Sequence, residues 1–391
     1  LTIFRWDGSS WTSEWTATVG GNGTNAQRFG IAYETQSGEA LVIYSRNVAT
    51  TNELAYRTKT NSNCGSGWSG EIPFDPVTTS GIVHWIRMEG SPVSSSNNIA
   101  VAWADSASDL SAMIWTGAGF TIGEPSSALE TQLERVSSSQ DVQSFDIAFE
   151  STSGELMVVW GLNQATTCTA VGTDTTTLSA TNCIRYKRYT SSWEATTVMN
   201  TVADPATNID ISANPNSDEL VMAALDNSQA DLSIAYWSGS AWTGRANQDT
   251  STNAAVAGGK YVATGWLISG STTRSVVLFV NGGAQSQRIH GFVGNGSTFT
   301  RQGNDTTPWF TPTPLFANAP RWIDIQMDPK NKDRLMFTLS DNASDLFAKR
   351  LVMTSTPTFT WSNSDAPSAP LEANLRQATT VPFGFAYWRN P

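Results

Sequence analysis

Two distant segments of this 391-residue chain repeat one pattern of strand, turn and strand. Residues 29–34 read Phe-Gly-Ile-Ala-Tyr-Glu, and residues 37–44 read Ser-Gly-Glu-Ala-Leu-Val-Ile-Tyr. Residues 145–150 read Phe-Asp-Ile-Ala-Phe-Glu, and residues 153–160 read Ser-Gly-Glu-Leu-Met-Val-Val-Trp. The first half of each phrase alternates large apolar with small or polar residues, whereas the second half is apolar on both faces. A strand that is apolar on both faces must lie in a sheet that is covered on both sides.

The first-strand pattern recurs along the whole chain with a period of about 60 residues. Its copies begin near residues 29, 83, 145, 209, 262, 323 and 383. Most copies end in a Gly/Ser turn closed by an aromatic residue, as in residues 237–242, Trp-Ser-Gly-Ser-Ala-Trp. No segment has a sustained helical period. We therefore predict an all-β chain that forms a single domain over residues 1–391, a seven-bladed β-propeller.

The two ends of the sequence predict how this propeller closes. Residues 383–388 (Phe-Gly-Phe-Ala-Tyr-Trp) repeat a first strand, while residues 1–11 repeat a third strand and its closing turn. We expect the last blade to be closed by both termini, with residues 1–28 completing it. No second strand is recognisable for this blade. The blade is then three-stranded, or the gene product continues beyond Pro391, or another chain donates a strand to the open edge.

Composition excludes some partners and suggests a location. The net charge of −11 argues against nucleic acid, since no cationic stripe is present to displace counterions from phosphates. No apolar run approaches the roughly 20 residues that span a bilayer. Only 15% of the residues are charged, Ser, Thr, Asn and Gly fill the other polar positions, and Trp occurs 16 times. We predict a secreted or cell-surface protein, processed or excerpted from something longer because it opens in mid-pattern.

Cysteines and sequons fit that location. Cys168 and Cys183 flank a polar stretch within one repeat, and we expect a disulfide that closes a long hairpin loop. The alternative is three reduced thiols in a cytosolic protein; in either case Cys64 has no partner. Possible glycosylation sites are Asn22, Asn295, Asn304 and Asn342.

Three loops between second and third strands share a pair of aspartates. These residues are Asp105, Asp109, Asp226, Asp231, Asp341 and Asp345. In one interpretation they form an acidic face that binds a basic partner or a cation such as Ca²⁺, which prefers oxygen ligands. In the other, each aspartate caps its hairpin by accepting backbone N–H groups, and repetition in three blades favours this reading. Asp146, Asp210 and Asp324 of the first strands are expected near the same rim.

Most tryptophans occupy repeat positions, where packing explains them without a ligand. Trp309 and Phe310 fall outside the repeat, in the Pro-rich connection 306–320, and we predict that they contact a partner. The sequence contains few residues in patterns that are typical of catalytic sites. The two histidines, His84 and His290, lie in strand patterns, and no nucleophile elbow, metal-ligand spacing or phosphate-binding Gly loop is present. We assign no catalytic residue.

The Gly/Ser turns closed by Trp resemble those of bacterial and fungal propeller lectins and, more distantly, the Asp-box turns of sialidases. Only Asp7-Gly8 with Trp11 approaches an Asp-box, and its leading Ser is absent, so sialidase chemistry does not carry over. The lectin resemblance implies sugar pockets between blades, lined by Trp and Arg. No sugar-binding motif of that family matches residue by residue.

Three functions remain open at this point. The first is an extracellular, surface-displayed module that contacts protein chains or self-assembles through its open terminal blade. The alternative is a lectin-like module that binds polysaccharide. The third is a glycoside hydrolase or sialidase-like enzyme, which needs two carboxylates flanking a sugar. No cofactor is assigned apart from the possible Ca²⁺, and no nucleic acid or membrane insertion is expected.

Overall fold

The computed structural model describes the chain outside a set of short segments and a few longer ones. The residues outside the description are 7–8, 18, 20–26, 61–66, 77–80, 121–127, 135–141, 163–183, 200–205, 227–230, 251–258, 281–288, 304–308, 310–319, 355–357, 363–369, 374–382 and 385–391. The chain divides into two compact units, Leu1–Thr131 and Gln132–Pro391. Within the described residues all regular structure is β, in antiparallel sheets, and no helix is long and apolar enough to cross a membrane.

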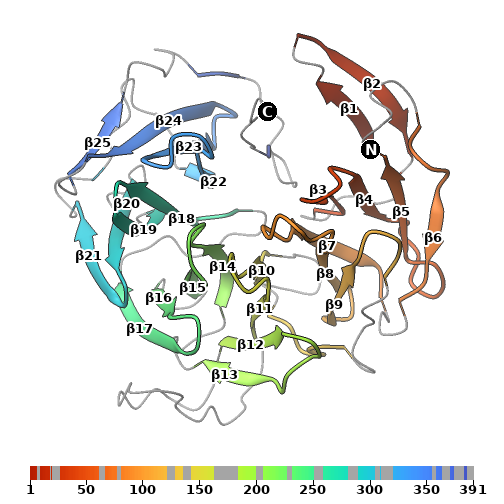
Figure 1. Cartoon of the computed structure of the whole chain (residues 1–391), viewed down its shortest axis with the longest axis horizontal. Helices are drawn as coiled ribbons and strands as arrows, with labels where there is room; N and C mark the ends of the chain where they lie inside the picture. Colours follow the sequence, from red (N-terminus) through yellow and green to blue (C-terminus); the bar gives the residue numbers. More distant parts are fainter. Residues whose placement is uncertain are drawn as a thin grey trace. The chain divides into compact units, whose positions relative to one another are not determined.

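The first unit contains three sheets whose strands follow one another in chain order (Figure 1). A hairpin consists of β1 (Thr2–Trp6) and β2 (Trp11–Thr16). The four-stranded sheet consists of β3 (Phe29–Tyr33), β4 (Ala40–Ser45), β5 (Leu54–Lys59) and β6 (Ile72–Phe74). The three-stranded sheet consists of β7 (Val83–Gly90), β8 (Ile99–Asp105) and β9 (Leu110–Trp115).

The second unit contains four sheets of four strands, again in chain order. The first two are β10 (Phe145–Phe149), β11 (Leu156–Gly161), β12 (Ile184–Tyr189) and β13 (Thr197–Met199), then β14 (Ala206–Ala213), β15 (Leu220–Asp226), β16 (Leu232–Trp237) and β17 (Trp242–Asp249). The next two are β18 (Val262–Ser269), β19 (Thr272–Val280), β20 (Ile289–Asn295) and β21 (Thr298–Gln302), then β22 (Pro320–Met327), β23 (Arg334–Asp341), β24 (Leu346–Met353) and β25 (Phe359–Ser362).

The prediction of an all-β chain of repeated antiparallel sheets is confirmed. Six of the seven expected first strands fall within β3, β7, β10, β14, β18 and β22. The seventh falls mostly outside the described residues, where only Phe383 and Gly384 are placed, and neither lies in a strand. The number of blades, the single domain and the closure by both termini therefore stay predictions.

Successive first strands lie against one another, β3 against β7 in the first unit and β10, β14, β18 and β22 in order in the second. Carboxylates on these strands join one sheet to the next. Oδ2 of Asp146 accepts the backbone N–H of Ile211 at 3.1 Å, and Oδ2 of Asp210 accepts the N–H of Thr264 at 2.6 Å. The first-strand aspartates thus act within the inter-sheet contacts of the second unit.

Lys260, which is 4% exposed, links three sheets of the second unit. Its Nζ lies 2.6 Å from Oδ1 of Asp210 and 3.3 Å from Oδ1 of Asp324. Apolar residues fill the space between the same sheets; Leu225, Val277 and Ile323 are all completely buried. The core therefore lies between sheets, as expected for second strands that are apolar on both faces.

β3 departs from this pattern because one of its faces is exposed. Phe29, Ile31 and Tyr33, which alternate along the strand, are 44%, 42% and 62% exposed. The opposite face packs against β7, where Gly30 lies so close that a Cβ would meet Met88 at 2.8 Å.

Candidate functional site

In two of the three loops between second and third strands, the first aspartate caps the turn by accepting backbone N–H groups. Oδ1 of Asp105 accepts the N–H groups of Ala107 and Asp109 at 2.8 and 3.0 Å, and its Oδ2 accepts Gly81 N–H at 2.8 Å. Oδ1 of Asp341 likewise accepts Ala343 N–H at 2.9 Å and Asp345 N–H at 3.1 Å. Among the described residues, no group of three His, Cys, Asp or Glu side chains is placed to hold a metal. Asp231 is buried, the side chain of Asp226 is not described, and the Ca²⁺ site stays a prediction.

Trp309, a predicted partner contact, is partly buried and packs against the core of the second unit. Its ring lies 6.0 Å from Phe359 and 5.7 Å from Trp361, between centroids, and it abuts Gly291, where a Cβ would meet it at 2.5 Å. Phe310 lies outside the described residues.

The remaining predicted sites divide between described and undescribed positions. Cys64, Cys168, Cys183, Asn22 and Asn304 lie outside the described residues. Asn295 and Asn342 are both exposed, at the end of β20 and in the turn after β23, as a glycosylation site requires. His84 and His290 are buried within β7 and β20. None of these placements assigns a ligand.

The second unit brings aromatic rings and charges together between its first two sheets. Side chains two apart on a strand share a face, so Tyr186 and Arg188 of β12 both face the sheet of β14–β17. Cζ of Arg188 lies 5.1 Å from the ring centroid of Trp237, a cation–π distance. The ring of Tyr186 lies 6.2 Å from those of both Trp237 and Trp242.

Three carboxyl groups lie around these aromatic rings. Arg188 forms ion pairs with Glu155, to which its Nη2 donates a hydrogen bond, and with Glu194 at 3.8 Å. Glu150 accepts a hydrogen bond from Nε1 of Trp237 at 2.7 Å, and burial raises its pKa above the ordinary value. We call Glu150, Glu155, Tyr186, Arg188, Glu194, Trp237 and Trp242 the Arg188 cluster.

A tight turn between β10 and β11 fixes two of these carboxyl groups. Gly154 has a φ of 72°, which favours glycine, and its N–H donates to the carbonyl of Glu150 at 3.0 Å. Asp218 of the next sheet accepts the N–H groups of Thr152 and Ser153 at 2.7 and 2.9 Å. Glu150 and Glu155 are therefore held in place by their own turn and by the neighbouring sheet.

The first unit repeats part of this arrangement between its second and third sheets. Nε1 of Trp115 donates to Glu34 at 2.7 Å, as Trp237 does to Glu150, and Tyr56 lies 5.5 Å from Trp115 between ring centroids. The position of Arg188 is taken by Thr58. This copy keeps the aromatic rings and the carboxylate but lacks the cation.

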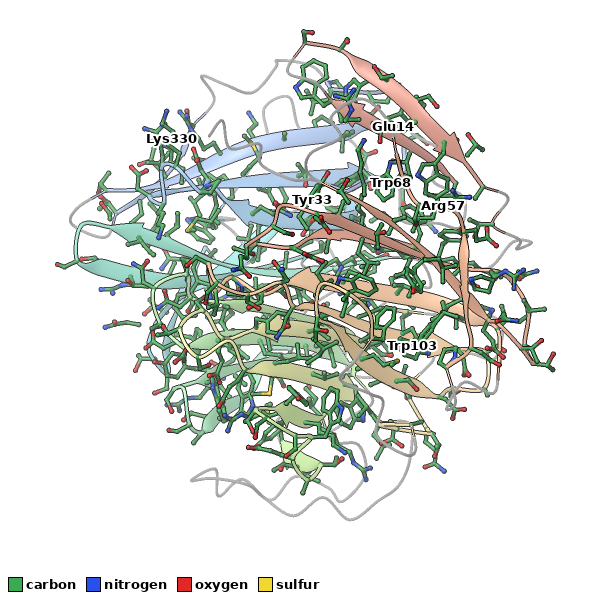
Figure 2. The ribbon with its side chains drawn as sticks, turned by 45° about the vertical axis from the view of Figure 1, so that its right-hand side comes forward. Glu14, Tyr33, Arg57, Trp68, Trp103 and Lys330 are labelled. Atoms are coloured by element: carbon green, nitrogen blue, oxygen red, sulfur yellow. The ribbon has the colours of Figure 1, made fainter. Side chains whose placement is uncertain are left out.

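A second arginine occupies the equivalent strand position in the first unit. Arg5 of β1 precedes a Ser-Ser-Trp turn, as Arg188 does, and its Nε donates to Glu14 of β2 at 2.7 Å. Glu14, which is labelled near Trp68 in Figure 2, accepts a hydrogen bond from Nε1 of Trp68 at 2.6 Å. It accepts a further hydrogen bond from Lys59. Burial opposes ionisation of Glu14, but the bonds from Lys59, Trp68 and Arg5 outweigh it and hold its pKa below the ordinary value.

Aromatic rings and a further cation line the same place. The ring of Trp15 lies 6.0 Å from that of Trp68 and 5.8 Å from that of Tyr44. Cζ of Arg57 lies 4.8 Å from the centroid of Trp15. We call Arg5, Glu14, Trp15, Arg57, Lys59 and Trp68 the Arg5 cluster.

The sequence alone did not single out these two clusters. The lectin resemblance implied pockets lined by Trp and Arg, but it pointed to no particular residues. Two signals were present: an arginine just before a Ser-Ser-Trp turn, and a glutamate directly after a first strand, at Glu34 and Glu150. Which tryptophan each glutamate meets depends on sheet stacking, and stacking is not written in local sequence.

No protein-family model and no curated protein matches the chain. Among solved structures, a lectin from Aleuria aurantia, described as a six-bladed β-propeller with a novel fucose recognition mode, is 13% identical, with 89% of this chain and 98% of the lectin covered and a TM-score of 0.39. The BP39L lectin from Burkholderia pseudomallei is 12% identical, with coverage of 87% and 99% and a TM-score of 0.35. A hypothetical selenium-binding protein from Sulfolobus tokodaii is 10% identical, with coverage of 88% and 76% and a TM-score of 0.46. The ligands named for those proteins belong to them.

Proposed function

We propose that this protein is a carbohydrate-binding module and that the Arg188 cluster is its main sugar site. A sugar ring presents C–H groups that pack on aromatic faces and hydroxyls that both donate and accept hydrogen bonds. The cluster offers complementary groups: a guanidinium with five donors, carboxylates that accept, and the half-buried ring of Tyr186, whereas Trp237 and Trp242 are buried beneath them. Small-ligand sites usually combine an apolar or aromatic lining with a small number of polar groups that point toward the ligand.

The observation that carries this proposal is the position of Arg188 above Trp237, between two carboxylates. The side chains of Arg188, Glu155 and Glu194 are 17%, 28% and 44% exposed, so a ligand can reach them from solvent. Beneath them, Trp237 is almost completely buried and is held by Glu150. The buried ring of Trp237 holds Arg188 in position, and the reachable guanidinium and carboxylates support binding of a ligand rich in hydroxyl groups.

Binding to a glycan array of neutral and acidic sugars, followed by calorimetry on the best ligand, tests the proposal. We expect Arg188→Gln to weaken binding about tenfold, since one charge-assisted hydrogen bond is lost. Arg334→Gln is the matched control, because Arg334 pairs with its neighbour Asp333 at 3.4 Å and belongs to neither cluster. A blank array, or equal affinity of the two variants, would overturn the assignment.

For the fold, we infer that the sheets of both units form one ring of seven blades over residues 1–391, with 383–388 as the first strand of the last blade. Two observations support this. Trp15 of β2 packs on Tyr44 and Trp68 much as Phe74 of β6 packs on Trp103 and Phe120, at 6.5 and 4.7 Å between centroids. The β1–β2 hairpin thus takes the two outer strand positions beside the sheet of β3–β6.

The exposed face of β3 is the second observation, because it is where the inner strands of that blade would pack. It also favours a second candidate function. An apolar sheet face beside an open edge accepts an extended segment of another polypeptide, and the chain would then act in an assembly. We propose an extracellular setting for either function. Light scattering over a range of concentrations tests the assembly function. Reversible association would support it, whereas a monomer at all concentrations would support a ring that is closed by its own termini.

A further inference from the structure

The two arginine clusters occupy equivalent places but differ in charge. In the Arg5 cluster, Arg5 and Lys59 both bond to Glu14, and Arg57 adds a third cation. In the Arg188 cluster, a single arginine meets Glu155 and Glu194, with the carboxyl group of Glu150 close by. Among the described members, cations are in excess in the first cluster and carboxyl groups are in excess in the second.

Both clusters contain buried donors that lack a hydrogen-bond acceptor among the described residues. Nε of Arg57 and Nε1 of Trp15 are both buried, and neither has a hydrogen-bond partner among the described residues. The same holds for Nε of Arg188 and Nε1 of Trp242 in the other cluster, so charge, and not the unpaired donors, distinguishes the two. Buried donors are almost always paired in folded proteins, so two unpaired donors within one cluster indicate a missing acceptor. Oxygen atoms of a carboxylate or sulfate are acceptors that also balance the surplus positive charge.

A ligand would meet this cluster from the side of Arg5. The side chain of Arg5 is 30% exposed, whereas those of Lys59 and Glu14 are 12% and 11% exposed. Arg5 uses its Nε for Glu14, and guanidinium groups bind carboxylates and sulfates through paired N–H donors. Glu14, whose pKa is held low, stays ionised and keeps both cations in position.

Local charge outweighs the charge of the whole protein at this site. The net charge of −11 repels anions at long range, but at physiological ionic strength charges more than about 8 Å away are largely screened. The cations of the cluster act at contact distance and are screened much less. An anionic ligand is therefore recognised here despite the acidic chain.

We propose that the Arg5 cluster binds the anionic group of an acidic sugar, whereas the Arg188 cluster binds neutral sugars. This inference rests on the proposed carbohydrate-binding function and names the substrate class of each site. The aromatic rings of Trp15 and Trp68 supply the packing surface for the sugar ring, and Arg5 and Lys59 bind its carboxylate or sulfate.

A matched pair of ligands tests the inference: a trisaccharide of galacturonic acid and the same trisaccharide with its carboxyl groups reduced to alcohols. Calorimetry on the full chain measures both affinities at low and physiological salt. We expect Arg5→Gln and Lys59→Gln each to weaken binding of the acidic trisaccharide about tenfold, and binding of that ligand to fall as salt rises. Arg188→Gln should leave the acidic trisaccharide unaffected and weaken only the reduced one.

Two controls keep the result interpretable. Arg334→Gln should change neither affinity, and thermal melting shows whether each variant is folded. If the acidic trisaccharide binds equally to the parent and to the Arg5 and Lys59 variants, or loses affinity on Arg188→Gln, the charge assignment is wrong. The proposed function then still stands, provided the reduced ligand depends on Arg188. If neither trisaccharide nor any glycan of the array binds, both proposals fail.

Discussion

Strands β3 and β10 have nearly the same sequence and differ sharply in burial. Phe145, Ile147 and Phe149 of β10 are at most 3% exposed. Their counterparts in β3 are 44%, 42% and 62% exposed. The sequence of a strand therefore indicates that both of its faces are suited to burial, but not whether a neighbouring sheet packs on each face. The exposed face of β3 marks the place where the described structure lacks a neighbouring sheet.

Shortening aromatic residues at matched positions gives the largest expected effect. Phe145→Ala removes a fully buried ring and should lower the free energy of unfolding by about 3–5 kcal/mol. Phe29→Ala, in a chain ending at Pro382, should cost less than about 1 kcal/mol because the ring is already half in water. Urea denaturation measures both.

The same substitution in the full chain sharpens the comparison. If residues 383–388 cover β3, Phe29→Ala costs more in the full chain than in the chain ending at Pro382. Equal costs in the two chains would contradict closure by the C-terminal segment, and a cost near that of Phe145→Ala in the shortened chain would contradict the exposure of β3.

The first strands of the second unit are joined by buried charges, whereas β3 has no such link to a sheet on its exposed face in the described structure. Lys260→Met leaves Asp210, whose side chain is 8% exposed, without its cation. Removing one partner of a buried pair is strongly destabilising, and we expect a loss of about 3 kcal/mol by urea denaturation. Arg334→Gln, which breaks a partly exposed pair, should change stability by less than about 1 kcal/mol. Equal effects of the two substitutions would show that the Lys260 pairs do not hold the sheets together.

Two buried carboxyl groups, one in each unit, have opposite surroundings. Asp210 of the second unit faces a lysine, whereas Glu53 of the first unit, 1% exposed, faces other acids. Burial, with a hydrogen bond to Asp75 and the charge of Asp105, raises the pKa of Glu53 to about 7. The folded chain therefore holds a proton that the unfolded chain releases near pH 4.5.

It follows that Glu53 costs stability as pH rises from 4.5 towards 7, and the full cost is present above pH 7. We expect the parent to lose roughly 1–3 kcal/mol more than Glu53→Gln between pH 5 and pH 8, because glutamine has no proton to release. Unfolding by urea at the two pH values gives this difference. Parallel pH profiles of the two proteins would mean that Glu53 is already ionised in the folded chain at pH 5.

Much of the fold could be predicted from sequence because it depends on local alternation. The starts at 29, 83, 145 and 262 coincide with described strands, and those at 209 and 323 fall inside strands that begin at Ala206 and Pro320. These two strands begin three residues earlier than predicted, in the region where first strands bond to the neighbouring sheet. One such hydrogen bond runs from Ile209 N–H to the carbonyl of Gln143 at 2.9 Å. Such a contact has no local signature.

The candidate site shows the same division. The resemblance of the turns to those of propeller lectins implied a pocket lined by Trp and Arg, without naming residues. The partners could not be predicted, because Glu150 and Trp237 come from different sheets, and the residues of the Arg5 cluster come from a hairpin and the sheet beside it. Only stacking of the sheets brings them together, and register fixes which face each side chain occupies.

The most direct test is a crystal structure of the full chain soaked with the best neutral oligosaccharide from the array. We predict electron density for a sugar ring against the Arg188 cluster, with hydroxyls within hydrogen-bond distance of Arg188 and Glu155. A sugar bound away from both arginine clusters, with Arg188 still paired as in the free chain, would contradict the proposed site.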